Sequence, residues 1–213
     1  MLTIHHLGKS QSERIVWLCE ELGIPYDLKR YDRDVRTMLA PADYKALHPL
    51  GAAPIIVDGD VVLAESAAIV DYIIARHGDG RLAVRPDDAG YADFLYWFHF
   101  VNGTLQPTLG RRMLLTRAAV ADDNAMVIAT TARIRLALGS IEQRLGSTAF
   151  LAGDTLTAAD IMMVFTLTTM RYFAPFNLTP YPAILAYLRR IGERPAYRAA
   201  MEKGDPDMVL LLD

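Results

Sequence analysis

The chain has 213 residues, which is enough for one large domain or two modest ones. It is 52% hydrophobic and 22% charged, with a formal net charge of -3 and no run or stripe of basic residues, so the composition argues against a nucleic-acid partner. Cys19 is the only cysteine, which excludes a disulfide within the chain.

The residue pattern indicates neither a metal nor a membrane. The five histidines lack paired ligand spacing, so we expect no metal site. No apolar stretch reaches the roughly 18 residues that span a bilayer, and the N-terminal residues do not have the pattern of a secretory signal. We therefore expect a cytoplasmic protein with no membrane partner.

The N-terminal residues predict a strand, a helix and a second strand. Residues 2–7 are typical of a short strand. Residues 13–22 place apolar side chains at helical spacing, and Gly23 and Pro25 follow as residues that end a helix. Residues 26–31 alternate in polarity and predict the second strand. This order favours a parallel pair of strands.

A hairpin and another helix follow. Residues 54–57 and 61–64 flank an Asp-Gly pair, which favours a tight turn between antiparallel strands. Residues 66–77 then show helical spacing, with Ser66 as the expected N-cap. The order βαβ followed by ββα is that of the thioredoxin fold, so we expect an α+β thioredoxin-like domain over residues 1–78.

The rest of the chain predicts an all-α helical bundle. Residues 79–89 are rich in glycine and aspartate and are expected to form a linker, with the helical domain over residues 90–213. Helical periodicity covers the ranges 90–117, 122–145, 158–174 and 181–193. Thr157 and Asp160 have the spacing of a capping box before an apolar run, and we assign them a structural role.

Four short motifs give the chain a specific resemblance. They are Ser10 to Ser12, HPLGAAP at 48–54, ESAAI at 65–69 and LTAADI at 156–161. In this order the chain resembles the cytosolic glutathione S-transferases over nearly its whole length, and it is most similar to the serine-type bacterial and fungal members. The resemblance implies glutathione as co-substrate, a homodimer and a role in detoxification.

The resemblance also implies a glutathione site in the first domain. Ala53, followed by a cis peptide bond to Pro54, would pair with the cysteinyl backbone of glutathione as an added strand does. Ser66, at a helix N-terminus, would hold the γ-glutamyl carboxylate, and Glu65 would hold the ammonium group. Many relatives carry Lys or Gln at the position of Ala52, and that side chain helps to hold the glycyl carboxylate of glutathione. The alanine side chain cannot do so. Lys9 or His48 is a candidate substitute.

Ser10 is the candidate catalytic residue, because a hydroxyl that donates to the glutathione sulfur favours its thiolate form. Two alternatives remain at this turn. Ser10 and Glu13 also have capping-box spacing, so Ser10 can be a cap while Ser12 or a backbone N–H contacts the sulfur. Cys19 lies on the apolar face of its helix and is interpreted as a core residue.

The expected function is attack of a glutathione thiolate on a hydrophobic electrophile. Residues of the helical domain would line the electrophile pocket, with Tyr96, His99 and Met113 as candidates. The alternative is a non-catalytic glutathione- or ligand-binding or scaffolding member of the same fold, which the alanine at position 52 favours. A thioredoxin-type protein that uses its own thiols is excluded, since the chain has no Cys-x-x-Cys.

Overall fold

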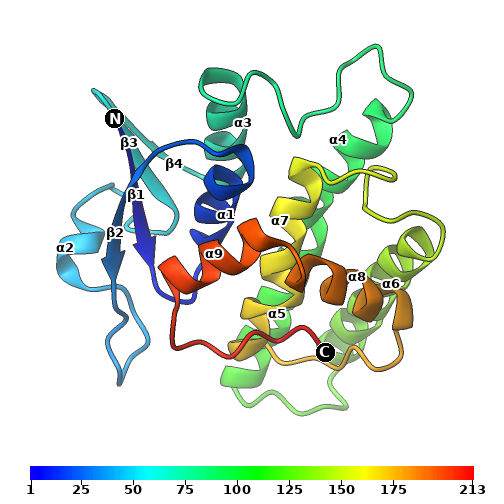
Figure 1. The fold of residues 1–213 in the computed structure, drawn as a ribbon. Coiled ribbons are helices and arrows are strands. Elements are labelled where there is room, and N and C mark those ends of the chain that lie inside the picture. The colour runs from blue at the N-terminus through cyan, green and yellow to red at the C-terminus, as the bar shows by residue number, and fades with distance from the viewer. The chain divides into compact units, whose positions relative to one another are not determined.

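The computed structural model describes residues 1–213 as two compact units. The first unit contains residues 1–83 and 192–210, and the second contains residues 84–191 and 211–213 (Figure 1). None of the helices has both the length and the apolar character that a membrane-spanning helix needs. Each unit is described separately below.

The first unit is built on a mixed sheet of four strands. These are β1 (Leu2–Leu7), β2 (Asp27–Tyr31), β3 (Ile55–Asp58) and β4 (Val61–Ala64). Their order is β2-β1-β3-β4, with β1 parallel to β2 and the other pairs antiparallel. The turn of the β3–β4 hairpin contains Gly59 at a φ of 60°, a conformation that glycine adopts without steric cost. The predicted strands and the parallel pair are confirmed.

The helices of this unit are α1 (Glu13–Leu22), α2 (Ala42–Lys45), α3 (Ser66–Arg76) and α9 (Pro195–Gly204). They include two that the sequence did not predict, α2 and α9. Helix α9 lies beside α1 (Figure 1), where the rings of Tyr197 and Trp17 meet edge to face at 5.1 Å. Arg194 and Lys203 form ion pairs with Glu21 and Glu20. The predicted helical domain of residues 90–213 therefore differs from the structure, because α9 packs in the first unit.

The second unit is entirely helical. Its elements are α4 (Tyr91–Phe100), η1 (Val101–Leu105), α5 (Gln106–Arg117), α6 (Ala125–Leu145), α7 (Ala158–Leu167), η2 (Thr169–Tyr172) and α8 (Pro182–Gly192). The expected helix over residues 90–117 contains the π-helical turn η1. Pro107 follows this turn; it has no N–H and its ring crowds the preceding helical turn, which accounts for the irregular hydrogen bonding.

A buried carboxylate joins the helices of the second unit. Asp160 is fully buried at the start of α7, where it completes the predicted capping box with Thr157. Its oxygens also accept the Leu151 N–H at 3.0 Å and the Tyr187 hydroxyl at 3.1 Å. Burial raises the pKa of Asp160 to about 6, although these hydrogen bonds favour its ionised form. Asp160 thus holds a loop, a helix start and α8 together.

Candidate active site

The turn between β1 and α1 places two serine hydroxyls in contact. Ser10 Oγ and Ser12 Oγ lie 2.7 Å apart, and both side chains are buried. Ser10 Oγ accepts the Ser12 N–H at 3.2 Å, and no side-chain cap hydrogen bond forms at Ser12, the residue before α1. The structure therefore places Ser12, and not Ser10, at the N-cap position of α1. Ser12 is fully buried, so Ser10 is the more accessible hydroxyl of the pair.

The loop before β3 has the expected cis peptide bond between Ala53 and Pro54. Ala53 packs on a small core cluster formed by Leu7, Tyr44 and Ile55. Leu7 ends β1, so this cluster fixes the loop near the end of the strand that leads to Ser10. The register of β3 with its neighbours begins at Ile55, which leaves the backbone of Ala53 outside the sheet ladder. A peptide-like ligand can pair with such a segment as an added strand.

The N-terminus of α3 is joined to the turn after β1 through a buried arginine. Arg14 Nη1 donates to Gln11 Oε1 at 2.6 Å and to Ser66 Oγ at 3.0 Å. Burial lowers the pKa of the Arg14 guanidinium to about 9, so it remains a cation at neutral pH. The guanidinium adds positive charge at a helix N-terminus, where backbone N–H groups already favour an anion.

Glu65 precedes α3 with an unusual backbone. Its φ is 71° and its ψ is 112°, a backbone conformation that residues other than glycine rarely adopt. The structure therefore makes Glu65 the N-cap and Ser66 the first helical residue, one position from the expected cap. Glu65 is exposed, whereas Ser66 is buried. Backbone strain of this kind is concentrated at ligand-binding sites.

A histidine and an aspartate lie behind the two serines. Ser12 Oγ is 3.0 Å from His6 Nδ1, and His6 Nε2 is 3.0 Å from Asp205 Oδ2. Asp205 Oδ1 also accepts the N–H of Lys9 at 2.9 Å. Burial opposes ionisation of Asp205, but the hydrogen bonds from His6 and Lys9 together with nearby positive charge keep its pKa below the usual value. His6 and Asp205 were not singled out from the sequence.

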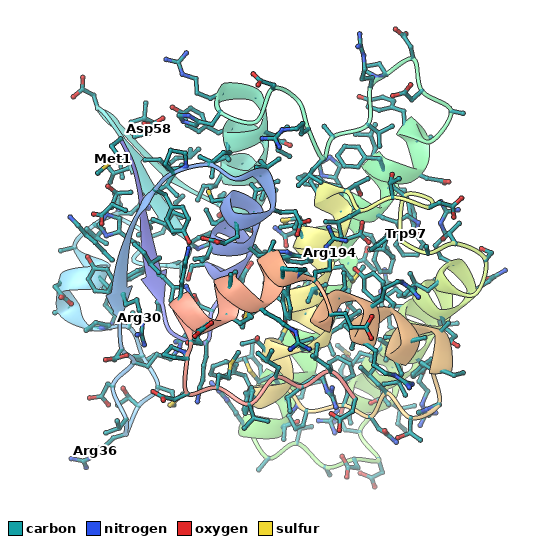
Figure 2. All side chains as sticks on the ribbon, viewed as in Figure 1. Met1, Arg30, Arg36, Asp58, Trp97 and Arg194 are labelled. Atoms are coloured by element: carbon teal, nitrogen blue, oxygen red, sulfur yellow. The ribbon has the colours of Figure 1, made fainter.

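A cavity of about 380 Å³ adjoins the residues that precede Ser10. Gly8, Lys9 and Arg33 line it together with Asp205 and its neighbours. Arg33 Nε donates to the carbonyl of Gly8 at 2.7 Å, which connects the loop after β2 to the turn. Arg36, in the same loop, points away from the sheet (Figure 2). Lys9 is thus the candidate substitute for Ala52 that lies in a cavity beside Ser10.

The family follows from comparison with known proteins. The model of the glutathione S-transferase N-terminal domain matches residues 10–76, and that of the glutathione S-transferase C-terminal domain matches residues 112–203. Glutathione S-transferase 3 of Schizosaccharomyces pombe is 33% identical, with 99% of this chain and 91% of that protein covered. The chain belongs to the glutathione S-transferase family. It is accordingly an enzyme, a glutathione transferase.

Further relatives agree with this assignment. Glutathione S-transferase 1 of Saccharomyces cerevisiae is 29% identical, with 95% of each chain covered. A solved glutathione S-transferase from Actinobacillus pleuropneumoniae is 35% identical, with a TM-score of 0.85 and coverage of 96% of this chain and 93% of that chain. The thioredoxin-like first domain and the helical second domain expected from the sequence are those of this transferase family.

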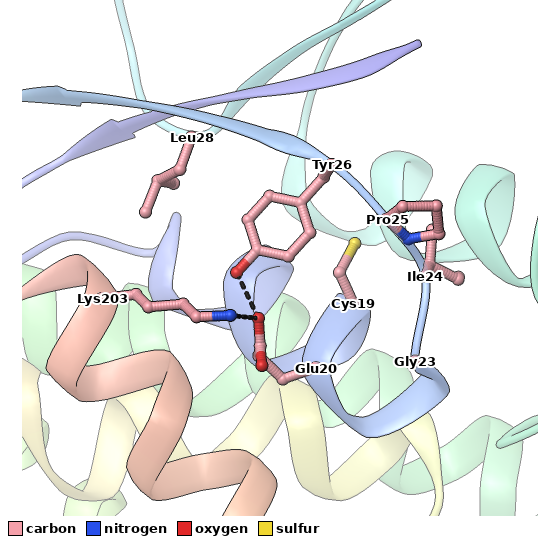
Figure 3. A pocket seen from close by; sticks show the side chains of 8 residues that line it. All are labelled: Cys19, Glu20, Gly23, Ile24, Pro25, Tyr26, Leu28 and Lys203. Atoms are coloured by element: carbon pink, nitrogen blue, oxygen red, sulfur yellow. Dashed lines mark hydrogen bonds and ion pairs between the residues drawn. The ribbon is translucent and has the colours of Figure 1, made fainter.

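Cys19 takes no part in the site of this transferase. Its side chain is buried, and burial raises the pKa of its thiol to about 12, so it is neither ionised nor accessible at neutral pH. A separate cavity of about 590 Å³ is lined by Cys19 and other residues near the C-terminal end of α1 (Figure 3), whereas Ser10 precedes the N-terminus of that helix. There Glu20 accepts hydrogen bonds from Tyr26 and Lys203, both at 2.5 Å, so these polar groups satisfy one another.

The expected electrophile residues all belong to the second unit. Tyr96 and His99 are exposed on α4, and Met113 is half-buried on α5. The neighbouring Trp97 and Phe100 are buried core residues whose rings contact each other at 5.2 Å. The side chains of Tyr96 and His99, by contrast, are exposed and can contact a ligand.

Sequence reasoning missed three residues of the site for different reasons. Arg14 lies two residues after Ser12, but its partner Ser66 is 52 positions away. His6 lies in a strand, where a buried histidine has no distinct local pattern. Asp205 is separated from His6 by 199 positions, so no sequence spacing indicates their contact.

Proposed function

We propose that this transferase activates glutathione as a thiolate at Ser10 and directs it to a hydrophobic electrophile. The observation that carries the proposal is the position of Ser10. Its hydroxyl stands before the N-terminus of α1 and is the more exposed end of a buried hydrogen-bonded pair. A donated hydrogen bond and the helix dipole both favour an anion there over a neutral thiol.

The remaining residues of the first unit would bind the rest of glutathione. Ser66 and the N-terminus of α3 favour the γ-glutamyl carboxylate, supported by the buried charge of Arg14. Glu65 has an exposed carboxylate one residue earlier, which suits the ammonium group. The backbone of Ala53, before cis Pro54, would pair with the cysteinyl residue.

Lys9 is the proposed partner of the glycyl carboxylate. The Lys9→Ala change is expected to raise KM for glutathione about tenfold and to leave kcat little changed, because it removes an attraction made equally in the ground and transition states. Steady-state kinetics with glutathione as the varied substrate measure this effect. The Lys45→Ala variant, which removes an exposed lysine of α2, is the control. A normal KM in Lys9→Ala would assign the carboxylate to another group.

A titration of bound glutathione tests the proposed function directly. The ultraviolet absorbance of the thiolate is followed against pH, with S-methylglutathione as the ligand that has no thiol proton. We expect saturable binding and a thiol pKa at least one pH unit below about 8.5. Binding with an unshifted pKa would favour a non-catalytic glutathione-binding role. Failure of glutathione to bind would contradict the proposal altogether.

The electrophile, the assembly and the cellular role are further proposals. Tyr96, His99 and Met113 offer aromatic and apolar contacts, which favour a hydrophobic electrophile. From the family we propose a homodimer that acts in detoxification in the cytoplasm. Sedimentation of the purified protein tests the dimer, and a mass near 23.7 kDa would contradict it.

A further inference from the structure

We propose that His6 and Asp205 form a buried proton acceptor that receives the thiol proton of glutathione through the hydroxyls of Ser12 and Ser10. This inference rests on the proposed function, since it requires the sulfur to lie against Ser10. The four side chains form an unbroken chain with separations of 3.0 Å, 3.0 Å and 2.7 Å from Asp205 to Ser10. His6 and Ser12 are fully buried, so Ser10 is the more accessible of the two serines, and Asp205 at the other end of the chain lines the cavity of about 380 Å³.

The partners of His6 determine its proton arrangement when the ring is neutral. Asp205 is a carboxylate whose pKa is below the usual value, and an ionised carboxylate can only accept. His6 Nε2 must therefore carry the proton that is donated to Asp205, and Nδ1 is left as an acceptor. Nδ1 faces Ser12 Oγ, so the Ser12 hydroxyl donates to it.

The hydrogen-bond partners of Ser12 also determine that the Ser10 hydroxyl donates its proton to Ser12. Ser12 Oγ has one proton and two lone pairs. Its proton is donated to His6 Nδ1 at 3.0 Å, which is nearer than the Leu7 carbonyl oxygen at 3.3 Å, and one lone pair accepts the N–H of Leu7 at 3.1 Å. The second lone pair is left for the proton of Ser10, 2.7 Å away. Ser10 Oγ then offers a lone pair, not a proton, to an incoming thiol.

Transfer of one proton reverses the hydrogen bonds between His6 and Ser12 and between Ser12 and Ser10, while His6 Nε2 still donates to Asp205. The S–H bond of glutathione breaks as its proton moves to Ser10 Oγ, the Ser10 proton moves to Ser12 Oγ, and the Ser12 proton moves to His6 Nδ1. The products are a thiolate and an imidazolium that faces the Asp205 carboxylate. Ser12 now donates to Ser10, and Ser10 donates to the thiolate. No oxidant or reductant is needed, and both serines end as neutral hydroxyls.

Charges and close packing around Asp205 support this role. Arg30 on β2 and Arg33 in the following loop interact electrostatically with Asp205 and help to keep it ionised. A Cβ on Gly204 would lie 3.1 Å from two ring atoms of His6, and one on Gly8 would lie 3.2 Å from Asp205 Oδ1. Glycine at both positions allows Asp205 to approach the ring and the turn.

The proposal makes His6 and Asp205 positioning residues, and proton counting distinguishes their role from a structural one. Glutathione is mixed with the enzyme at about pH 7.5 in weakly buffered solution with a pH indicator. Thiolate absorbance is recorded in the same experiment. Wild type is expected to form thiolate and to release almost no proton, because His6 retains it. Release of about one proton per thiolate would overturn the proposal and leave thiolate activation at Ser10 intact.

Two variants make the test specific. His6→Asn removes the acceptor, so the thiol pKa should rise by about one pH unit or more and each thiolate formed should release about one proton. His77→Asn is the matched control. His77 Nε2 lies 2.7 Å from Asp58 Oδ2 in an analogous pair that is not part of the chain at Ser10. It should behave as wild type. An unchanged thiol pKa and proton count in a folded His6→Asn variant would contradict the proposal.

Asp205→Asn separates a relay from a fixed hydrogen-bond donor. Its amide oxygen can still accept the Lys9 N–H, which turns the NH₂ group toward His6 Nε2. His6 then carries its proton on Nδ1, and Ser10 donates outward permanently, but the ring cannot accept a further proton. The proposal predicts a raised thiol pKa and proton release. A low pKa retained in this variant would show that outward donation alone is sufficient and would overturn the relay.

Discussion

The Ser10→Ala variant is expected to raise the thiol pKa of bound glutathione by about two pH units and to lower kcat/KM at neutral pH about 100-fold. The variant removes the more accessible hydroxyl of the turn, because Ser12 is fully buried. A shift of two pH units corresponds to about 2.7 kcal/mol of preference for the thiolate, which is within the strength of a hydrogen bond to a charged group. Thiolate absorbance against pH and steady-state rates measure both effects.

Ser66→Ala is the matched control for this result. It also removes a buried serine hydroxyl from the first unit, one that hydrogen-bonds Arg14 and Gln11 at the N-terminus of α3. We expect it to weaken glutathione binding and to leave the thiol pKa of the bound molecule unchanged. If the thiol pKa stays low in Ser10→Ala, a backbone N–H of the turn, and not the Ser10 hydroxyl, would be the group that activates the thiol.

The Asp160→Ala variant is expected to reduce the free energy of unfolding by about 3–4 kcal/mol. This is more than the loss of a helix cap alone, about 1–2 kcal/mol, because Asp160 also accepts the Leu151 N–H and the Tyr187 hydroxyl in a fully buried place. Denaturant unfolding measures it. Asp154→Ala, which removes an exposed carboxylate from the same loop, should have little effect. A loss below about 1 kcal/mol in Asp160→Ala would contradict the structural role.

The cost of Asp160→Ala is also expected to depend on pH. The pKa of Asp160 is about 6 in the native protein, above the ordinary value of 3.8, so the native state binds more protons between these values. Its contribution to stability therefore falls as pH rises from about 4 to about 6. The variant lacks this group, so its deficit should be about 1 kcal/mol greater at pH 5 than at pH 7.5. A smaller deficit at pH 5 would contradict the raised pKa.

Local patterns were sufficient for most of the fold. Hydrophobic periodicity and the Asp-Gly turn placed the strands and helices of the first 78 residues to within about two positions. The capping box at Thr157 and Asp160 was equally local, since its two members are three residues apart. The short helix α2 has only four residues, too few for a clear helical period, and α9 was missed although its apolar residues have helical spacing.

For the candidate site as well, the sequence predicted the residues of local motifs but not their distant contacts. Ser10, Pro54 and Ser66 each belong to a short motif, so the residues could be selected from the sequence and the family resemblance. Their surroundings could not. The cation beside Ser66 is Arg14, which belongs to α1. The carboxylate near Ser10 is that of Asp205, which follows α9.

The sequence by itself determined the order of the four strands and of helices α1 and α3, the turn that bears Ser10, and the helix start that bears Ser66, because each depends on residues within a few positions of one another. Only the tertiary structure decided that α9 packs on α1 and brings Asp205 to His6 across 199 positions. The proton arrangement at Ser10 follows from that contact. Long-range packing sets the chemistry here because the direction of a hydrogen bond depends on every partner in its chain, including the most distant one in the sequence.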